Sequence, residues 1–453
     1  MDKPARNTVA FATLGCKLNF AETSTIAKSF AAAGYRRVSA NSPADIYVVN
    51  TCSVTEHSDK KCRNLIRKLH KLSPDALIGV TGCYAQLKPR EVLQIEGVTA
   101  LFGTAHRGEV FGTLHRMLLE HKPDRTRNPE EERENEQKVQ ESDPGVDKKL
   151  SLISPIEGVK SIFQAYSSGE RTRSFLKVQD GCDYHCTYCT VPLARGDSRN
   201  IPISTLIRQA EEIASNGIVE IVLTGVNTGD FGKSTGESFL ELLKQLDRVE
   251  GIARYGISSI EPNLLTEEIV DWIASGSKFL PHFHIPIQSG CDAVLKRMRR
   301  RYTTALFESR IQMVRDKMEP PDQRFSRVFF GIDVIVGFPG ESDEEFEQTY
   351  LFLEKIRPAF LHIFPYSRRA GTQAATMSDQ VQESVKRMRA IRLKELSDRL
   401  NAEFYAANVG RTLPVLFEST RRGGMMLGYT DNYIKVERPY DPALIGRISQ
   451  VTL

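Results

Sequence analysis

After residue 171 the sequence alternates six times between a short apolar segment and an amphipathic segment of helical period. Strands are predicted at residues 175–179, 220–224, 254–258, 282–287, 328–336 and 360–365. Helices are predicted between them at 204–216, 239–246, 267–274, 305–316 and 343–356. Because successive β-α units cross over in one right-handed sense, six of them predict a barrel or an incomplete barrel.

Three cysteines follow the first of these strands within one short loop, at Cys182, Cys186 and Cys189. Three thiolates in this C-x3-C-x2-C spacing can hold three irons of a [4Fe–4S] cube and leave the fourth iron open to a small molecule. The alternative is zinc, but structural zinc requires four ligands, and His185 is awkwardly placed for a fourth. The pattern therefore favours an iron–sulfur cluster at the active-site face of the barrel.

The beginning of the chain also alternates between strand and helix. Strands are predicted at residues 9–14, 45–50 and 77–81, helices at 21–33 and 58–72, and further elements at 89–95 and 108–119. Repeated β-α units with short connections predict an open, mostly parallel sheet.

Three more cysteines lie one or two residues beyond the predicted strands of this sheet, at Cys16, Cys52 and Cys83. Because the carboxyl ends of parallel strands share one edge, we expect these thiols to converge on one site. Three unrelated buried cysteines are the alternative, but a thiol after each of three successive strands favours a second three-thiolate cluster. Cys62, within a predicted helix, and Cys291 are predicted to be structural.

The composition limits the class of protein. The 453 residues predict two to four domains, and a hydrophobic content of 40% with 26% charged residues is typical of a globular protein. No apolar run has membrane-spanning length, and the N-terminus lacks a signal-peptide pattern. We therefore expect a cytoplasmic protein whose eight cysteines serve metal or redox chemistry. A net charge of +4 permits a nucleic-acid partner without requiring one.

The remaining segments are predicted to be a linker, a helix and a small β module. Residues 122–149 are highly charged and lack apolar periodicity, which predicts a solvated linker. A long basic helix is predicted at 381–406, followed by short strands at 413–418, 426–430, 432–436 and 444–451. A module of about forty residues is too small for a large core, so we expect it to pack against its neighbours.

Further motifs accompany the two cysteine sets: Val191-Pro-Leu-Ala-Arg-Gly196, His284-Ile-Pro-Ile-Gln-Ser-Gly290 and Asp333-Val-Ile-Val-Gly-Phe-Pro-Gly-Glu341. With these motifs the chain resembles the methylthiotransferases of the radical-SAM superfamily along its whole length. The resemblance implies an α/β protein with an N-terminal open parallel α/β domain that binds an auxiliary cluster (1–121) and a charged linker (122–168). It also implies an incomplete (β/α)6 radical-SAM barrel (169–378), a basic helix (379–408) and an RNA-binding, all-β TRAM-like module (409–453).

The resemblance also implies two [4Fe–4S] clusters and S-adenosylmethionine, with Cys182, Cys186 and Cys189 generating a radical and the other three cysteines presenting sulfur. Leu14-Gly-Cys-Lys-Leu-Asn-Phe-Ala-Glu22 and Gln179-Asp-Gly-Cys-Asp183 look like the branch that modifies N6-threonylcarbamoyladenosine 37 of tRNA. Other branches act on isopentenyladenosine in tRNA or on an aspartate of a ribosomal protein. A target carbon with an unactivated C–H bond requires such a radical route.

Candidate S-adenosylmethionine contacts lie at the carboxyl ends of the predicted barrel strands and in the cysteine loop. They are Tyr188, Gly225, Val226, Asn227, Gln288, Ser289 and Gly337. The glycine at 225 would let the backbone approach the methionine amino and carboxylate groups closely. Packing alone is the alternative explanation of Tyr188.

Candidate RNA contacts are clustered basic residues, which phosphate binding requires, with Tyr302 as an aromatic partner for a base. They are Arg297, Arg299, Arg300, Arg301, Lys386 and Arg387. An ordinary solvated helix face is the alternative for any one of them.

Two hypotheses of different class follow. The first is a tRNA methylthiotransferase, whose partners would be tRNA, an electron donor such as a flavodoxin or ferredoxin, and a sulfur donor, with no membrane. The second is an RNA-binding protein whose cysteines hold zinc.

Overall fold

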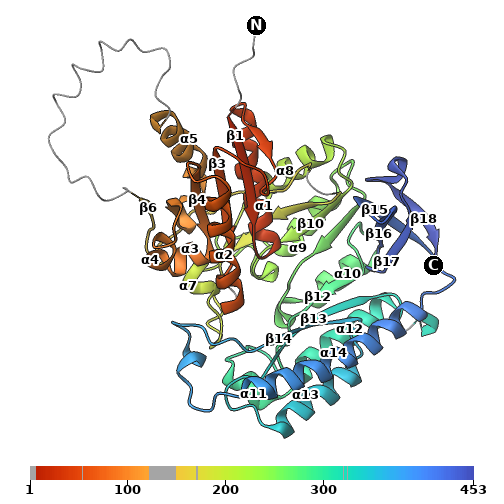
Figure 1. Ribbon diagram of the computed structural model, residues 1–453. Helices are drawn as coiled ribbons and strands as arrows, with labels where there is room; N and C mark the ends of the chain where they lie inside the picture. The colour runs from red at the N-terminus through yellow and green to blue at the C-terminus, as the bar shows by residue number, and fades with distance from the viewer. Residues whose placement is uncertain (1–6, 54, 122–148, 170–171, 320, 324) are drawn as a thin grey trace, which may run out of the picture. The chain divides into compact units, whose positions relative to one another are not determined.

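The computed structural model describes residues 7–53, 55–121, 149–169, 172–319, 321–323 and 325–453 (Figure 1). The chain divides into two compact units. The first comprises Met1–Asn19 and Thr25–Ile156, and the second comprises Phe20–Ser24 and Glu157–Leu453. Within the described ranges, no helix has the length and apolar character needed to cross a membrane.

The first unit is built on a six-stranded sheet of order β2-β1-β3-β4-β5-β6, in which every pair of neighbours is parallel. Its strands are β1 (Thr8–Thr13), β2 (Arg36–Val38), β3 (Ile46–Thr51), β4 (Leu77–Gly82), β5 (Val98–Phe102) and β6 (Leu150–Leu152). Its helices are α1 (Lys17–Ala32), α2 (Glu56–Leu72), α3 (Cys83–Leu87), α4 (Pro89–Leu93) and α5 (Val110–His121). Both central strands, β3 and β4, are buried throughout, as expected for a parallel sheet covered on both faces.

The predicted open parallel sheet is confirmed, with three differences in detail. Helix α1 begins at Lys17, four residues before the predicted start, because Cys16 occupies its N-cap position. Strands β2, β5 and β6 were not predicted, and β6 lies within the stretch predicted as a linker but pairs with β5. Residues 122–148 of that predicted linker lie outside the described residues.

The second unit contains six parallel strands that follow one another in sequence order: β7 (Ser174–Lys177), β10 (Glu220–Thr224), β11 (Arg254–Ile257), β12 (His282–His284), β13 (Phe329–Val336) and β14 (Phe360–Pro365). Strands β7, β10 and β11 pair with one another, as do β12, β13 and β14. A parallel bridge between Ser259 and His284 joins the two sets. This arrangement is the predicted incomplete barrel.

Amphipathic helices cover one face of these strands: α8 (Ile203–Ser215), α9 (Phe239–Asp247), α10 (Glu267–Ala274), α11 (Asp292–Arg297), α12 (Thr304–Met318), α13 (Asp343–Ile356) and α14 (Glu383–Ala406). The predicted strand at 282–287 is wrong in its length and ends at His284. Pro286 lacks the N–H that a continued ladder requires, and Gln288 has a φ of 70°.

The C-terminal module is an antiparallel sheet of order β17-β16-β15-β18 with a small core of Val415, Phe417 and Met426. Its strands are β15 (Thr412–Arg422), β16 (Met425–Thr430), β17 (Lys435–Pro439) and β18 (Ile448–Thr452). As expected for so small a core, the module packs against the barrel. Arg254 donates to Tyr429 O at 3.1 Å, and the ring of Tyr433 stacks on His282 with centroids 4.2 Å apart.

Candidate active site

The loop that carries Cys182, Cys186 and Cys189 directly follows β7 and is closed at its base by a short antiparallel pair, β8 (Gln179–Asp180) and β9 (Arg199–Asn200). Helix α7 (Val191–Arg195) lies between the last cysteine and β9. Gly181 has a φ of 74°, and a side chain there would place a Cβ 2.0 Å from the carbonyl oxygen of Asp197. Only glycine fits this turn, and it brings the two ends of the loop together.

Each of the three sulfurs in this loop accepts a hydrogen bond. The amide of Tyr184 donates to Cys182 Sγ at 3.4 Å, and the amide of Val191 donates to Cys189 Sγ at 3.4 Å. The guanidinium of Arg300 donates to Cys186 Sγ at 3.1 Å. N–H groups directed at cysteine sulfur suit thiolates that bind iron, because such hydrogen bonds tune cluster potentials. The donor set therefore fits an iron–sulfur cluster.

Burial dominates the electrostatics of these thiols. It raises the pKa of Cys182 to about 12 and that of Cys189 to about 12, with the neighbouring cysteines adding to the rise. Raised pKa values argue against a free thiolate nucleophile in this loop.

Arg300 is held in a buried network and does not point into solvent. Its Nη2 pairs with Glu261, and its Nε and Nη2 donate to Tyr302 Oη at 2.9 and 2.8 Å. Tyr302 Oη in turn donates to the carbonyl oxygen of Pro286 at 2.6 Å. Desolvation raises the pKa of Glu261, although the charge of Arg300 opposes that rise. These residues position a guanidinium against Cys186.

Gln179 ties the cysteine loop to the loop after β10. Its Oε1 accepts from the amides of Val226 and Asn227 at 2.9 and 3.0 Å, and its Nε2 donates to the carbonyl oxygen of Gly181 at 2.7 Å. Both amides therefore already have an acceptor, and contacts of Val226 and Asn227 with S-adenosylmethionine stay a prediction. A Cβ at Gly225 would lie 2.9 Å from Gln179 Oε1, so glycine is required there by this contact.

The other predicted cofactor contacts differ in accessibility. Tyr188 packs against the cysteine loop, and its Oη accepts a hydrogen bond from Arg300 Nη1 at 3.4 Å. Burial raises the pKa of Tyr188. Gln288 is half-buried, with the positive φ noted above. The hydroxyl of Ser289 is fully buried and lies 3.1 Å from Thr349 Oγ1 of α13, which leaves its predicted contact with S-adenosylmethionine without support. Gly337 directs its amide to Glu341 Oε2 at 2.6 Å.

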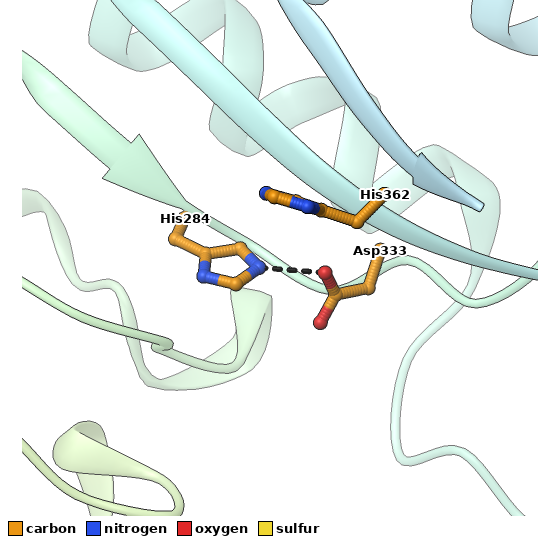
Figure 2. Close-up of side chains that lie close together, drawn as sticks. All are labelled: His284, Asp333 and His362. Atoms are coloured by element: carbon orange, nitrogen blue, oxygen red, sulfur yellow. Dashed lines mark hydrogen bonds and ion pairs between the residues drawn. The ribbon is translucent and has the colours of Figure 1, made fainter. Parts of the chain in front are cut away.

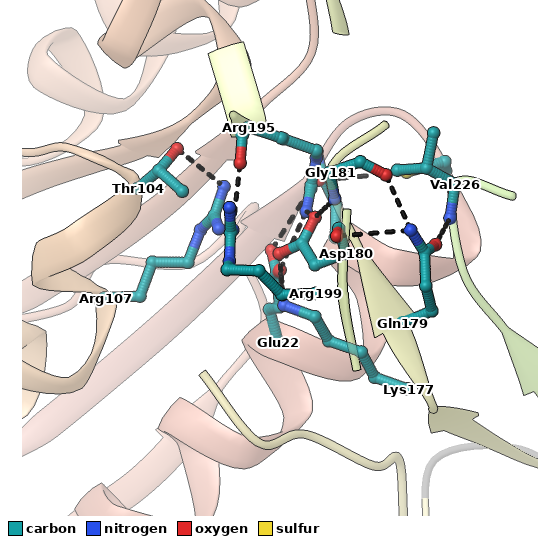
Figure 3. A network of polar contacts seen from close by, with 12 residues as sticks. Glu22, Thr104, Arg107, Lys177, Gln179, Asp180, Gly181, Arg195, Arg199 and Val226 are labelled. Carbon is teal, nitrogen blue, oxygen red and sulfur yellow. Dashed lines mark hydrogen bonds and ion pairs between the residues drawn. The ribbon is translucent and has the colours of Figure 1, made fainter. Parts of the chain in front are cut away.

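Behind the cysteine loop lies a buried group of four charges in the second unit (Figure 3). Lys177 Nζ contacts Glu22 Oε1 at 2.8 Å and Asp180 Oδ2 at 2.6 Å. Arg195 Nη1 contacts the same two carboxylates at 3.1 and 2.8 Å. All four side chains are at most 2% exposed. Two cations and two anions balance one another, and they fix both ends of the segment that carries the cysteines.

In the first unit the predicted cysteines follow three adjacent strands at one sheet edge. Cys16 caps α1 after β1, Cys52 follows β3, and Cys83 begins α3 after β4. The register places Thr13 beside Asn50 and Thr51 beside Gly82. The predicted convergence of the three loops is therefore present in the fold.

Close contacts hold these three loops together. Asn19 Nδ2 donates to the carbonyl oxygens of Leu14 and Thr51 at 2.8 and 3.0 Å. A Cβ at Gly15 would lie 2.7 Å from Cys52 Cβ, and one at Gly82 would lie 2.3 Å from the carbonyl oxygen of Thr51. Both glycines have positive φ, so the chain can turn tightly at the two cysteines that follow them.

Cys62 and Cys291 are buried in apolar surroundings. Cys62 Sγ donates to the carbonyl oxygen of Cys52 at 3.5 Å, and burial raises its pKa to about 11. A thiol that remains protonated and donates a hydrogen bond is a structural one, as the sequence predicts.

A second polar cluster lies in the barrel, and the sequence predicts no role for it, although His284 and Asp333 belong to two of the motifs above. His284, Asp333 and His362 lie on β12, β13 and β14, with their ligating atoms within 4.8 Å of one another (Figure 2). His284 Nε2 and Asp333 Oδ1 are 2.7 Å apart. Their sequence neighbours on each strand are apolar and pack in or against the core under the helices, so the side-chain alternation of a strand places all three polar residues on the opposite face. That alternation was the available signal.

Comparison with known proteins agrees with this geometry. Residues 8–103 match the model of the uncharacterized protein family UPF0004, and residues 176–353 match the radical SAM superfamily. The threonylcarbamoyladenosine tRNA methylthiotransferase MtaB of Bacillus subtilis is 40% identical over 98% of this chain and 93% of its own length. The chain belongs to the radical-SAM methylthiotransferase family.

Other relatives lie in two branches of this methylthiotransferase family. The MtaB protein of Aquifex aeolicus is 35% identical over 95% of this chain and 96% of its own length. The tRNA-2-methylthio-N(6)-dimethylallyladenosine synthase of Symbiobacterium thermophilum is 32% identical over 97% of this chain and 90% of its own length. The radical S-adenosylmethionine methyltransferase TsrM of Kitasatospora setae is 14% identical, with a TM-score of 0.54 over 82% of this chain and 77% of that chain. That likeness shows the fold alone.

Membership of the methylthiotransferase family makes the chain an enzyme and sets aside the zinc-containing RNA-binding protein as its class. The structure places the basic residues that the sequence predicts to contact RNA.

The side chain of Arg300 is buried against the cysteine loop, so it is not available as a phosphate contact. Lys386 is also buried, with its side chain packed on Gly337 and paired with Glu383, so it is not free for a phosphate either.

The remaining basic candidates differ in exposure. Arg297 is half-buried and forms a bidentate pair with Glu345. Arg301 lies over the ring of Tyr184 at 4.1 Å and donates to the carbonyl oxygen of Asp183. Arg299, Arg301 and Arg387 are exposed and stay predictions as RNA contacts. Tyr302 is buried, and the hydrogen bonds of its hydroxyl leave it unsuited to stack on a base.

Proposed function

We propose that this protein adds a methylthio group to C2 of N6-threonylcarbamoyladenosine 37 in tRNA. The observation that carries the proposal is the match over nearly the full length to relatives named for this reaction, at 40% and 35% identity. Both cysteine sets that the reaction requires are present at strand ends. We also place the protein in the cytoplasm with its tRNA substrate, and we expect an external electron donor and sulfur donor.

Two groups of three cysteines would hold the two [4Fe–4S] clusters of the family. Cys182, Cys186 and Cys189 would hold the cluster that binds S-adenosylmethionine, and Cys16, Cys52 and Cys83 the auxiliary cluster. When bound, these groups supply the one-electron chemistry that an unactivated aromatic C–H bond requires.

The protein's own residues orient and shield this site. Arg300, held by Glu261 and Tyr302, keeps an N–H on Cys186 Sγ. Gln179 fixes the distance between the cysteine loop and the loop after β10. The burial of Cys182 and Cys186 excludes water from the sulfurs.

Analysis of tRNA nucleosides tests the proposal. Cells that lack this protein are expected to accumulate N6-threonylcarbamoyladenosine and to lose its 2-methylthio derivative, and the unaltered protein is expected to restore it. Cys186→Ser is the inactive control, and Cys62→Ser is the matched control for an ordinary buried thiol. Persistence of the 2-methylthio derivative in the deletion strain contradicts the proposed target.

The isopentenyladenosine branch is the second candidate, favoured by a 32% identical relative. The same nucleoside analysis separates the two, because loss of 2-methylthio-isopentenyladenosine alone would assign the chain to that branch.

A further inference from the structure

Strands β12, β13 and β14 present a polar and aromatic face on the side opposite the helices. Along β14, Leu361 belongs to the core under the helices, and Ile363 packs against that core. Residues of alternate parity point the other way: Phe360, His362 and Phe364. Figure 1 shows α12, α13 and α14 on one side of these strands, which leaves the other side as the inner face of the incomplete barrel.

The polar part of this face is the cluster of His284, Asp333 and His362 in Figure 2. The side chains of His284 and Asp333 are 22% and 20% exposed. His284 and His362 lie with their ring centroids 5.1 Å apart. Two imidazoles and a carboxylate together offer both donors and acceptors to a ligand.

Bound metal is not the best explanation of this cluster. His284 Nε2 and Asp333 Oδ1 are 2.7 Å apart, which is the length of a direct hydrogen bond. Two ligands at about 2.0–2.1 Å from a tetrahedral zinc ion would lie farther from each other than this. The geometry shows an N–H of His284 donating to Asp333, and that pair then faces the inner side.

The aromatic part of the face is exposed to an unusual degree. Phe360 and Phe364 are 38% and 41% exposed, and the Phe360 ring meets His362 edge to face at 4.9 Å. The ring of Phe364 lies four residues further along β14, beyond His362 and near the carboxyl end of the strand. An exposed ring there offers a π-face on which a base can stack.

This face is continuous with the cysteine loop. The amide of Ile260 donates to the carbonyl oxygen of His284 at 3.1 Å, and the next residue, Glu261, pairs with Arg300. Arg300 contacts Cys186 Sγ. A ligand on this face therefore lies close to the group that Cys186 holds.

We propose that His284, Asp333, His362 and Phe364 bind the target nucleoside, with the base on the ring of Phe364 and the N6 substituent on the histidines and Asp333. The inference rests on the proposed function. A threonylcarbamoyl group carries N–H, hydroxyl, carbonyl and carboxylate groups that match this mixture of donors and acceptors. An isopentenyl group has none, so it would desolvate these polar side chains without offering them a new hydrogen bond.

Binding of anticodon stem-loop RNA to the reconstituted holoenzyme tests the inference. The probes are one RNA with N6-threonylcarbamoyladenosine at position 37 and one with adenosine there. We expect Asp333→Asn and His362→Gln to reduce the preference for the modified RNA about tenfold each, as for loss of a hydrogen-bonding partner that the bound nucleoside would bury. Asp322→Asn, which removes the same charge from the exposed loop before β13, should keep the preference.

Phe364→Ala removes an exposed ring, so it keeps the experiment interpretable if a polar variant fails to fold. It is expected to weaken binding of both RNAs through lost stacking. An unchanged preference in Asp333→Asn and His362→Gln, with unchanged affinity in Phe364→Ala, overturns the inference while the proposed function stands. Stoichiometric zinc in the holoenzyme that is lost in Asp333→Asn also overturns it, in favour of a metal site. If the unaltered enzyme does not methylthiolate the modified RNA, the proposed function fails and the inference fails with it.

Discussion

The two cysteine sets of this protein are built in opposite ways. Cys182, Cys186 and Cys189 lie in one loop whose base is closed by the β8–β9 pair. Cys16, Cys52 and Cys83 come from three loops that only the register of a parallel sheet brings to one edge. The first arrangement depends on local hydrogen bonds and buried charges, and the second depends on the whole sheet. The difference teaches that one kind of site can be specified locally or by topology, with different sensitivities to change.

The largest expected effect separates the roles of the two sets. Cys186→Ser in the barrel loop is expected to abolish both S-adenosylmethionine cleavage and methylthiolation. Cys52→Ser in the sheet-edge set is expected to retain cleavage and lose methylthiolation. Quantifying 5′-deoxyadenosine and methylthiolated tRNA in parallel checks both. Loss of both activities in both variants, with intact circular dichroism spectra, would show that the sets do not act separately.

The next effect tests how far the barrel loop depends on its buried charges. Lys177→Met removes a buried cation that contacts both Glu22 and Asp180, and breaking such a buried pair is expected to cost about 3–5 kcal/mol of unfolding free energy. Lys394→Met removes an exposed lysine paired with Asp398 and is the matched control, expected to cost less than about 1 kcal/mol. Urea unfolding of the holoenzyme measures both, and equal costs would contradict the importance of the buried network.

The comparison also explains what the sequence could predict. The strand-helix alternation predicts all six strands of the barrel and three of the six strands of the first sheet, because buried parallel strands are continuous apolar runs and their helices have a clear apolar stripe. The cysteine positions followed from the fact that carboxyl ends of parallel strands share an edge. Short strands such as β6, three residues long and remote from β5 in sequence, carry too little pattern to be recognised.

The predicted RNA contacts that the structure overturns are wrong about the direction in which the side chain points. Arg300 was grouped with Arg299 and Arg301 because a run of arginines reads as one charged surface. In the structure Arg299 has a φ of 57°, so the chain turns there and Arg300 points inward to Glu261. The prediction that Lys386 contacts RNA is wrong for the same reason. Its side chain is buried against Gly337, because a lysine on a basic helix can pack its aliphatic stem against a neighbouring element. Partners such as Glu261 lie far away in sequence and give no local signal.

A smaller effect is expected from the glycines at the two sites. Gly82→Ala and Gly181→Ala both impose a positive φ on alanine, which alone costs about 1–3 kcal/mol. Both also place the alanine Cβ within 2.3 Å of a backbone oxygen, so the local backbone has to shift as well. Their consequences should differ: Gly82→Ala disturbs the sheet edge and is expected to halve the iron content while retaining S-adenosylmethionine cleavage. Gly181→Ala is expected to lose cleavage and keep the other iron. Iron analysis and the cleavage assay check this, and identical phenotypes would contradict separate construction.

The smallest effect probes a single hydrogen bond of the local loop. Ser198 Oγ accepts from Gln179 Nε2 at 2.9 Å, and the same nitrogen donates to the carbonyl oxygen of Gly181. Ser198→Ala removes one of these acceptors, which is expected to cost about 1 kcal/mol because Gln179 keeps its other partners. A loop loosened by that amount should bind S-adenosylmethionine about fivefold more weakly by calorimetry. Ser215→Ala, at an exposed serine on α8, is the matched control and should leave the affinity unchanged. If Ser198→Ala binds as tightly as the unaltered enzyme, Gln179 does not need this contact to hold the loop, and the remaining bond to Gly181 is sufficient.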